Sequence, residues 1–183
     1  MVKGRDLWIL AEAFLYPEET WKEIFSHLFS LAQVLGLPLP EDLQVKNLRE
    51  LQAEYTRLFI NSPYSTPVPP YASVYLSLDR RLQGEGYEQA RAFYRQAGLE
   101  PVEEGELADH LAYELSFMAL LLEEGRFPLL GRFLSEHFLR WYPRFLVALE
   151  QADPLPLYRL LGRIVLAITH KLQEVVHEKA GLS

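Results

Sequence analysis

The segment LYRLLGRIVLAITHKLQEV, residues 157–175, decides the fold class of this chain. Its apolar residues recur every three or four positions, the spacing that places them on one face of an α-helix. The same spacing recurs in further stretches, at 21–35, 48–59, 111–122 and 134–145. Strand signals are nearly absent, because apolar and polar residues rarely alternate and no Asn-Gly or Asp-Gly turn occurs. The sequence therefore predicts an all-α protein of about seven to nine helices.

Breaks rich in proline and glycine interrupt this pattern, and Pro143 is expected to kink or restart the helix at 134–145. Residues 61–70 contain four prolines, which remove backbone donors from helical hydrogen bonds. A second joint at 98–106 contains two glycines and a proline. We expect a single compact domain whose parts, residues 1–98 and 107–183, are joined by a hinge at 99–106. Because domains swap through such hinges, we expect either a monomer or a domain-swapped dimer.

Composition limits the class of protein. The chain has 183 residues, 49% of them apolar, so it can bury roughly 70% of its unfolded surface without a disulfide or a metal. It has no cysteine, which excludes disulfides, thiolate metal sites and thiol catalysis. A formal net charge of −7 opposes binding to nucleic acid, whose phosphates it would repel. No run of about 18 uncharged apolar residues and no signal-peptide pattern occurs, so we expect a cytoplasmic protein without membrane insertion.

The chain carries no recognisable catalytic or metal motif. Ser73 lacks the Gly-x-Ser-x-Gly surroundings of a hydrolase nucleophile, and no glycine-rich phosphate loop occurs. Glu174 and His177 have the Glu-x-x-His spacing of a di-iron bundle, but no second copy accompanies them. The five histidines are therefore interpreted as scattered helix-surface residues. We expect neither an enzyme nor a bound metal or cofactor.

A candidate binding site begins where the prolines end. Tyr71 and Tyr75 follow the stiffened segment and lie one helical turn apart, which suits a surface that holds a partner. Asp109 and His110 precede the helical stretch at 111–122, where a carboxylate is favoured as a cap or in the first turn. A cation is disfavoured there, so His110 should be neutral, with Glu114 within its reach on the same helix face.

Acidic residues gather around this second segment, at Glu100, Glu103, Glu104, Glu106 and Asp109. Such a run is usually a solvated linker. The alternative is an acidic rim beside an apolar groove, which would suit a peptide that is basic at one end and apolar after it. Charges of this kind would steer and orient the partner more than hold it.

Three segments together resemble the TorD/DmsD-type chaperones. They are EYTRLF at 54–59, PYASVYL at 70–76 and LADHLAYELSFM at 107–118. The order and spacing of these segments agree with the family across nearly the whole chain. One departure is that Leu107 and Ala108 stand where the family often has a proline. NarJ-like relatives usually have another residue in place of His110, so the TorD/DmsD branch is favoured.

The resemblance implies a cytoplasmic maturation chaperone for molybdopterin oxidoreductases. Such a protein binds the twin-arginine signal peptide or N-terminus of the catalytic subunit and holds it until the cofactor is inserted, before export. The alternative is a NarJ-like nitrate reductase assembly factor, the delta subunit, which acts on a client that is not exported.

We expect the binding site of such a chaperone to lie between the two parts of the chain. Its residues would be Tyr71, Tyr75, Asp109 and His110, with Glu104 and Glu106 at the rim. The two tyrosines would form an apolar wall, and Asp109 would receive a guanidinium group. The alternative for Tyr75 and His110 is that they are core residues that tie the two parts together.

Overall fold

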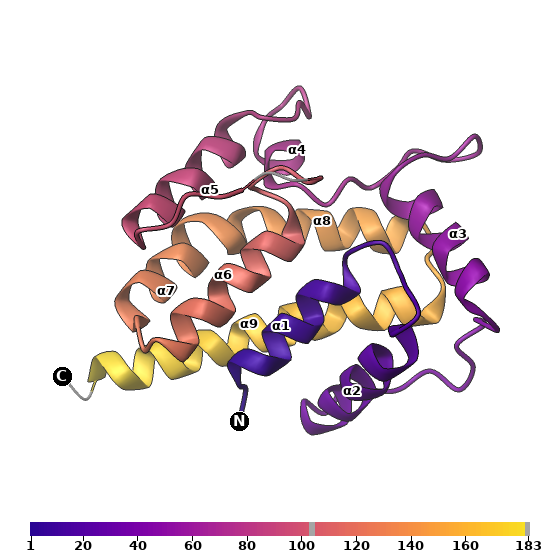
Figure 1. Ribbon diagram of the computed structural model, residues 1–183, viewed down its shortest axis with the longest axis horizontal. Helices are drawn as coiled ribbons and strands as arrows, with labels where there is room; N and C mark the ends of the chain where they lie inside the picture. The colour runs from indigo at the N-terminus through magenta and orange to yellow at the C-terminus, as the bar shows by residue number, and fades with distance from the viewer. Residues whose placement is uncertain (103–104, 182–183) are drawn as a thin grey trace.

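The computed structural model describes residues 1–102 and 105–181, and these residues form an all-α fold, as predicted (Figure 1). The helices are α1 (Gly4–Ala13), α2 (Trp21–Val34), α3 (Leu48–Phe59), α4 (Ala72–Leu76), α5 (Glu85–Gln96), α6 (Leu111–Glu123), α7 (Phe127–Phe133), the π-helix η1 (Leu134–Phe138), α8 (Leu139–Gln151) and α9 (Pro156–Gly181). The β-type pairing found within the described ranges is one isolated bridge, between Tyr71 and His110. None of the described helices combines the length and the apolar content needed to cross a membrane.

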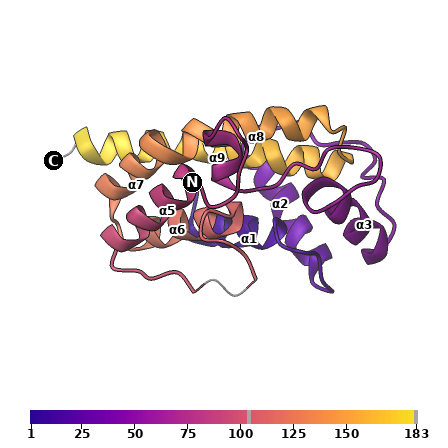
Figure 2. The ribbon, with the colours of Figure 1, turned by 90° about the horizontal axis from the view of Figure 1, so that it is seen from above.

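Helices from both sides of the expected hinge share one core. Helix α1 packs along α6 and also contacts α9, while α4 packs against α8. Figure 2 shows α8 and α9 in one layer and α1 and α6 in a second layer against them. The long helix α9 runs along the length of the molecule, from the α3 end to the α7 end (Figure 1). The parts before and after residues 99–106 therefore belong to a single compact domain.

Local sequence explains where several helices begin and end. The side chain of Asn47 accepts a hydrogen bond from the Glu50 amide at 3.0 Å and so caps α3. Gly98 and Gly125, with φ of 82° and 67°, follow the ends of α5 and α6 in the left-handed conformation that glycine adopts most readily. Of the kink or restart expected at Pro143, the restart is wrong, because α8 continues through this residue. The irregular turn is η1, which ends directly before α8 and lies upstream of the proline.

The EYTRLF segment is a structural joint. The Tyr55 hydroxyl donates to the carbonyl of Phe14 at 3.0 Å, which connects α3 to the end of α1. Glu54 is buried and its Oε2 accepts from the amide of Leu155 at 2.7 Å, just before α9. Arg57 pairs with Glu54 at 2.6 Å and donates to backbone carbonyls in the turn between α8 and α9. This segment therefore holds the α8–α9 turn and the α1–α2 connection together.

Candidate functional site

The two other signature segments meet through their backbones. Tyr71 and His110 form the isolated antiparallel bridge, in which the amide of Ala72 donates to the carbonyl of Asp109 at 3.2 Å. This pairing places the start of α4 directly against the start of α6. Tyr71 and the Asp109–His110 pair, separated by almost forty residues in sequence, are therefore neighbours in space, as the site hypothesis requires.

Asp109 caps α4 and not the helix that follows it in sequence. Its Oδ2 accepts a hydrogen bond from the amide of Ser73 at 2.9 Å, and the whole residue is buried. Helix α4 needs this distant acceptor because its own N-cap residue, Tyr71, makes no side-chain capping bond. Burial raises the pKa of Asp109, while hydrogen bonds from Ser73 oppose the rise. The expectation that Asp109 caps or opens α6 is therefore wrong, because Asp109 faces α4.

His110 is the N-cap residue of α6. Its Nδ1 accepts a hydrogen bond from the amide of Ala112 at 3.0 Å, which requires that nitrogen to be unprotonated. Burial lowers the pKa of His110 to about 3, so the ring is neutral, as predicted. The nearest carboxylate is Glu106, whose Oε2 lies 3.9 Å from Nε2. That distance is too long for a hydrogen bond, and the desolvation of the buried ring outweighs the attraction of the partly exposed carboxylate.

Ser73 has a structural role at the same junction. Its Oγ accepts hydrogen bonds from the amides of Gly84, at 3.1 Å, and Tyr87, at 2.8 Å, and so caps α5. Helix α5 approaches α4 very closely at Gly86, where an added Cβ would lie 2.7 Å from the amide nitrogen of Ser73. Asp109 therefore orders α4, and α4 in turn orders the start of α5.

A buried polar network lies near this junction, and the sequence did not predict it. Glu114 does not reach His110: its Oε2 lies 2.8 Å from Nε2 of His137, and its Oε1 accepts from Nε1 of Trp141 at 3.0 Å. Nδ1 of His137 lies 3.1 Å from Oε1 of Gln89. Burial raises the pKa of Glu114, and the neighbouring His137 opposes the rise. The interpretation of the histidines as helix-surface residues is wrong for His110 and His137, since both are buried.

The sequence contains one signal for the buried pair of Glu114 and His137, which is the position of both residues within apolar stripes. Glu114 interrupts the stripe at 111–122, and His137 interrupts the stripe at 134–145. A charged residue on a buried face needs a partner, but the sequence does not say which residue that partner is. Across the part of the chain that the structure describes, no group of three or more potential ligands is arranged to hold a metal ion.

Tyr75 is a core residue. Its hydroxyl donates to the carbonyl of Pro69 at 2.9 Å, and its ring stacks on Trp141 with 6.0 Å between the ring centroids. Arg144 donates to the Tyr75 carbonyl at 2.8 Å, which fixes α4 on α8. The alternative in which Tyr75 and His110 tie the two parts of the chain together describes this arrangement. Tyr71 and Tyr75 do not form the expected apolar wall, because Tyr75 faces α8.

Tyr71 and Glu106 are the predicted site residues that reach the surface. Tyr71 is half-buried, its ring meets His110 edge to face at 5.0 Å, and its hydroxyl donates to the Glu106 carboxylate. The Glu106 side chain is 32% exposed. We call these two residues the Tyr71–Glu106 edge. Glu104 lies outside the described residues, so its role at the rim stays a prediction.

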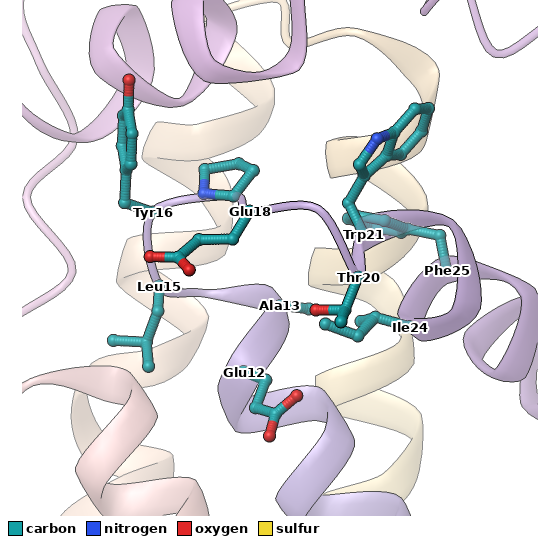
Figure 3. A pocket seen from close by; sticks show the side chains of 10 residues that line it. Glu12, Ala13, Leu15, Tyr16, Glu18, Thr20, Trp21, Ile24 and Phe25 are labelled. Carbon is teal, nitrogen blue, oxygen red and sulfur yellow. The ribbon is translucent and has the colours of Figure 1, made fainter. Parts of the chain in front are cut away.

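A separate pocket opens between α1 and α2. It has a volume of about 300 Å³, and none of its lining residues belongs to the predicted site. Figure 3 shows the carboxylates of Glu12 and Glu18 and the rings of Tyr16 and Trp21 around it. The sequence offered no signal for this pocket, since its lining comes from a helix end, a loop and the next helix.

Comparisons with known proteins match the chain to one family and to named chaperones. The family model described as "Nitrate reductase delta subunit" matches residues 18–147. The Tat proofreading chaperone DmsD of Salmonella typhi is 30% identical over 128 residues, which cover 69% of this chain and 62% of that protein. The chaperone protein TorD of Vibrio cholerae is 32% identical over 146 residues, with 70% of this chain and 65% of that protein covered.

A solved structure extends the similarity to nearly the whole chain. A putative redox enzyme maturation protein from Archaeoglobus fulgidus superposes with a TM-score of 0.60 and 26% identity, covering 97% of this chain and 95% of that one. The present chain spans 62% and 65% of the length of the two curated relatives, and all three relatives are named for chaperone or maturation roles. The chain belongs to the nitrate reductase delta subunit family and, within it, resembles the TorD/DmsD-type redox-enzyme maturation chaperones.

Proposed function

We propose that this protein is a cytoplasmic chaperone for the catalytic subunit of a molybdopterin oxidoreductase. It binds the twin-arginine signal peptide or N-terminus of that subunit and assists cofactor insertion and assembly before export. Its relatives are named Tat proofreading chaperone DmsD and chaperone protein TorD, which supports the chaperone class. In this proposal the protein acts by binding a client and not by catalysis.

The observation that carries the proposal is the accessible carboxylate of Glu106, which directly precedes one signature segment and is hydrogen-bonded to Tyr71 of another. Its Oε2 accepts from Tyr71, and its Oε1 is the oxygen that a client arginine would reach. A guanidinium group bonded to this carboxylate would form a charge-assisted hydrogen bond beside the ring of Tyr71. The net charge of −7 would favour the approach of a basic segment.

The buried residues of the predicted site would support the Tyr71–Glu106 edge without contacting the client. Asp109 orders the start of α4, and His110 orders the start of α6. Tyr75 fixes α4 on α8 through Trp141. In this proposal these residues position the Tyr71–Glu106 edge, because in the described conformation each of them is covered by neighbouring helices.

A second candidate function is that of a NarJ-like nitrate reductase assembly factor acting on a client that is not exported. The description of the matching family, "Nitrate reductase delta subunit", favours this alternative. The two candidates differ in what the client must carry. A proofreading chaperone should depend on the arginine pair of a signal peptide, and an assembly factor for a non-exported client should not.

Titration of a fluorescent twin-arginine peptide tests the proposal. The wild-type protein should bind it, and Glu106→Gln should weaken binding about tenfold or more, because a hydrogen bond between charged groups is lost. Glu178→Gln is the matched control, since it removes the same charge from an exposed position on α9. A peptide with both arginines replaced by glutamine should bind as weakly to the wild type as the original peptide does to Glu106→Gln.

Two results would contradict parts of the proposal. If the wild-type protein binds no twin-arginine peptide, the chaperone function proposed for this chain is wrong. If the glutamine peptide binds as tightly as the arginine peptide, the client is recognised without its arginine pair, and the assembly-factor alternative is favoured.

A further inference from the structure

An open apolar groove lies between α1 and α6, next to the Tyr71–Glu106 edge. We call it the α1–α6 groove, and its volume is about 260 Å³. Its walls include Trp8 of α1, Leu99 and Val102 of the segment after α5, and Tyr113, Ser116 and Leu120 of α6. Tyr94 and Phe117, which are buried and meet edge to face with 4.8 Å between their ring centroids, form its floor.

The groove is held in shape by the helices that form it. Nε1 of Trp8 donates to Oε1 of Glu123 at 2.7 Å, which fixes the indole of α1 against α6. Glu123 reaches this position by passing over Gly4, where an added Cβ would lie 2.4 Å from the Glu123 side chain. Because α1 and α6 also pack along their length, the groove exists before any ligand arrives.

Its surface is unusually apolar for an exposed site. Trp8, Leu99 and Val102 are 40%, 37% and 71% exposed, respectively. One such residue alone would be ordinary, but several around one groove are typical of an interaction site. Pockets for small molecules usually enclose about 300–1,000 Å³, so this smaller, open groove suits a few apolar side chains of a peptide better.

The groove lies close to the proposed arginine-binding edge. Tyr113, which lines the groove, has its ring 6.2 Å from that of His110, and the His110 ring lies 5.0 Å from that of Tyr71. An extended peptide advances roughly 3.3–3.6 Å per residue, so about three residues would bridge this separation. Glu100, at the groove itself, lies 3.7 Å from Arg95, and among the described residues we assign the basic residue of the ligand to Glu106.

We propose that the α1–α6 groove binds the apolar segment that follows the arginines of the client peptide. This inference rests on the proposed chaperone function and assigns a second, separate surface to the same ligand. The order of the two surfaces, acidic and then apolar, matches a peptide that is basic and then apolar. The groove takes the place of the tyrosine wall expected from the sequence, since Tyr75 is buried against Trp141.

The test compares two synthetic peptides, each with an arginine pair followed by a short spacer. One continues with a run of leucine and alanine, and in the other serine replaces the leucines. Wild-type protein should bind the leucine peptide about tenfold more tightly, because burial of a few aliphatic carbons favours it. Trp8→Ala removes a wall of the groove, and Ser116→Trp fills the groove. Both variants should reduce the ratio of the two peptide affinities, leucine over serine, to near one. Trp21→Ala is the matched control, because it changes a tryptophan of the pocket in Figure 3 and should keep the ratio.

The outcomes separate this inference from the proposed function. If wild-type protein binds neither peptide, the proposed function fails and the inference fails with it. If wild-type protein prefers the leucine peptide and both groove variants keep the preference, the groove assignment is wrong while the chaperone function stands. If the groove variants change the sedimentation coefficient but not peptide binding, the groove is a contact between copies of this chain, which also overturns the inference.

Cross-linking of the unmodified protein gives an answer even if a variant does not fold. A leucine peptide that carries photo-leucine in its apolar half should cross-link to α1, to residues 99–102 or to α6. Cross-links confined to other helices would refute the proposal.

Discussion

Substitution of Asp109 distinguishes a positioning role from direct contact with a client. The carboxylate accepts from the amide of Ser73 at 2.9 Å, and the residue is fully buried. Asp109→Ala leaves that amide without an acceptor and removes the cap of α4. Asp109→Asn keeps an oxygen in the same place and removes only the charge.

The structure sets the expected magnitudes. An unsatisfied buried amide costs about 1–3 kcal/mol, and loss of a helix cap costs about 0.5–2 kcal/mol; the two estimates describe largely the same hydrogen bond. Removal of a carboxylate whose burial already raises its pKa offsets part of this loss. We therefore expect Asp109→Ala to lower the free energy of unfolding by about 2 kcal/mol, or roughly 4–8 °C in Tm. Asp109→Asn should change it by less than about 1 kcal/mol.

Urea denaturation and peptide titration of both variants form the assay. Asp109→Asn should bind the twin-arginine peptide with wild-type affinity, because the Tyr71–Glu106 edge remains in place. Hydrogen exchange at Ser73 should be faster in Asp109→Ala alone. Two results would refute this reasoning: equal stability of the alanine variant and the wild type, or a tenfold loss of affinity in Asp109→Asn at unchanged stability. The second result would show that the charge itself meets the client.

Other perturbations have equally definite outcomes. Burial lowers the pKa of His110 to about 3, so below pH 6.5 the unfolded chain takes up a proton that the folded ring does not. The free energy of unfolding therefore decreases as the pH is lowered. Between pH 7 and 5 the wild type should lose about 2 kcal/mol more than His110→Asn in urea denaturation, and equal losses would contradict the assignment. Gly86→Ala should lower stability by about 1–3 kcal/mol in thermal unfolding, since its Cβ meets Ser73, while Gly181→Ala, in open space, should be neutral. Glu114→Leu should lower the free energy of unfolding by about 3 kcal/mol, because it leaves His137 buried without its carboxylate. Adding His137→Leu to this variant should recover part of the lost stability. A loss below about 1 kcal/mol in Glu114→Leu alone would argue against a stabilising pair.

Most residues of the three signature segments have structural roles, since they connect and cap helices. EYTRLF connects α3 to Phe14 and to the α8–α9 turn through hydrogen bonds between its side chains and backbone groups. PYASVYL and the Asp109–His110 pair form one junction, in which Ser73 and Asp109 cap neighbouring helices. From this junction, Tyr71 and Glu106 reach the surface. A shared sequence pattern therefore identifies the family through its fold, and only a small part of it is available for recognition.

The sequence by itself determined the helices, because apolar spacing and local caps act over a few residues. The stretches at 48–59 and 111–122 correspond closely to α3 and α6, and Asn47 caps α3 from its own neighbourhood. The resemblance to TorD/DmsD-type chaperones was likewise carried by short segments in register. Both kinds of information survive in the order of residues along the chain.

Tertiary structure alone decided which side chains are buried and which reach the surface. Asp109 and Ser73 are thirty-six positions apart, so no local rule could show that one caps the other. Tyr75 is covered by Trp141 of α8, although both tyrosines look equivalent in the sequence. The α1–α6 groove joins Trp8 to residues at least 86 positions away. Burial and hydrogen-bond partners depend on which helices meet in space, and the helical period of a segment does not contain that information.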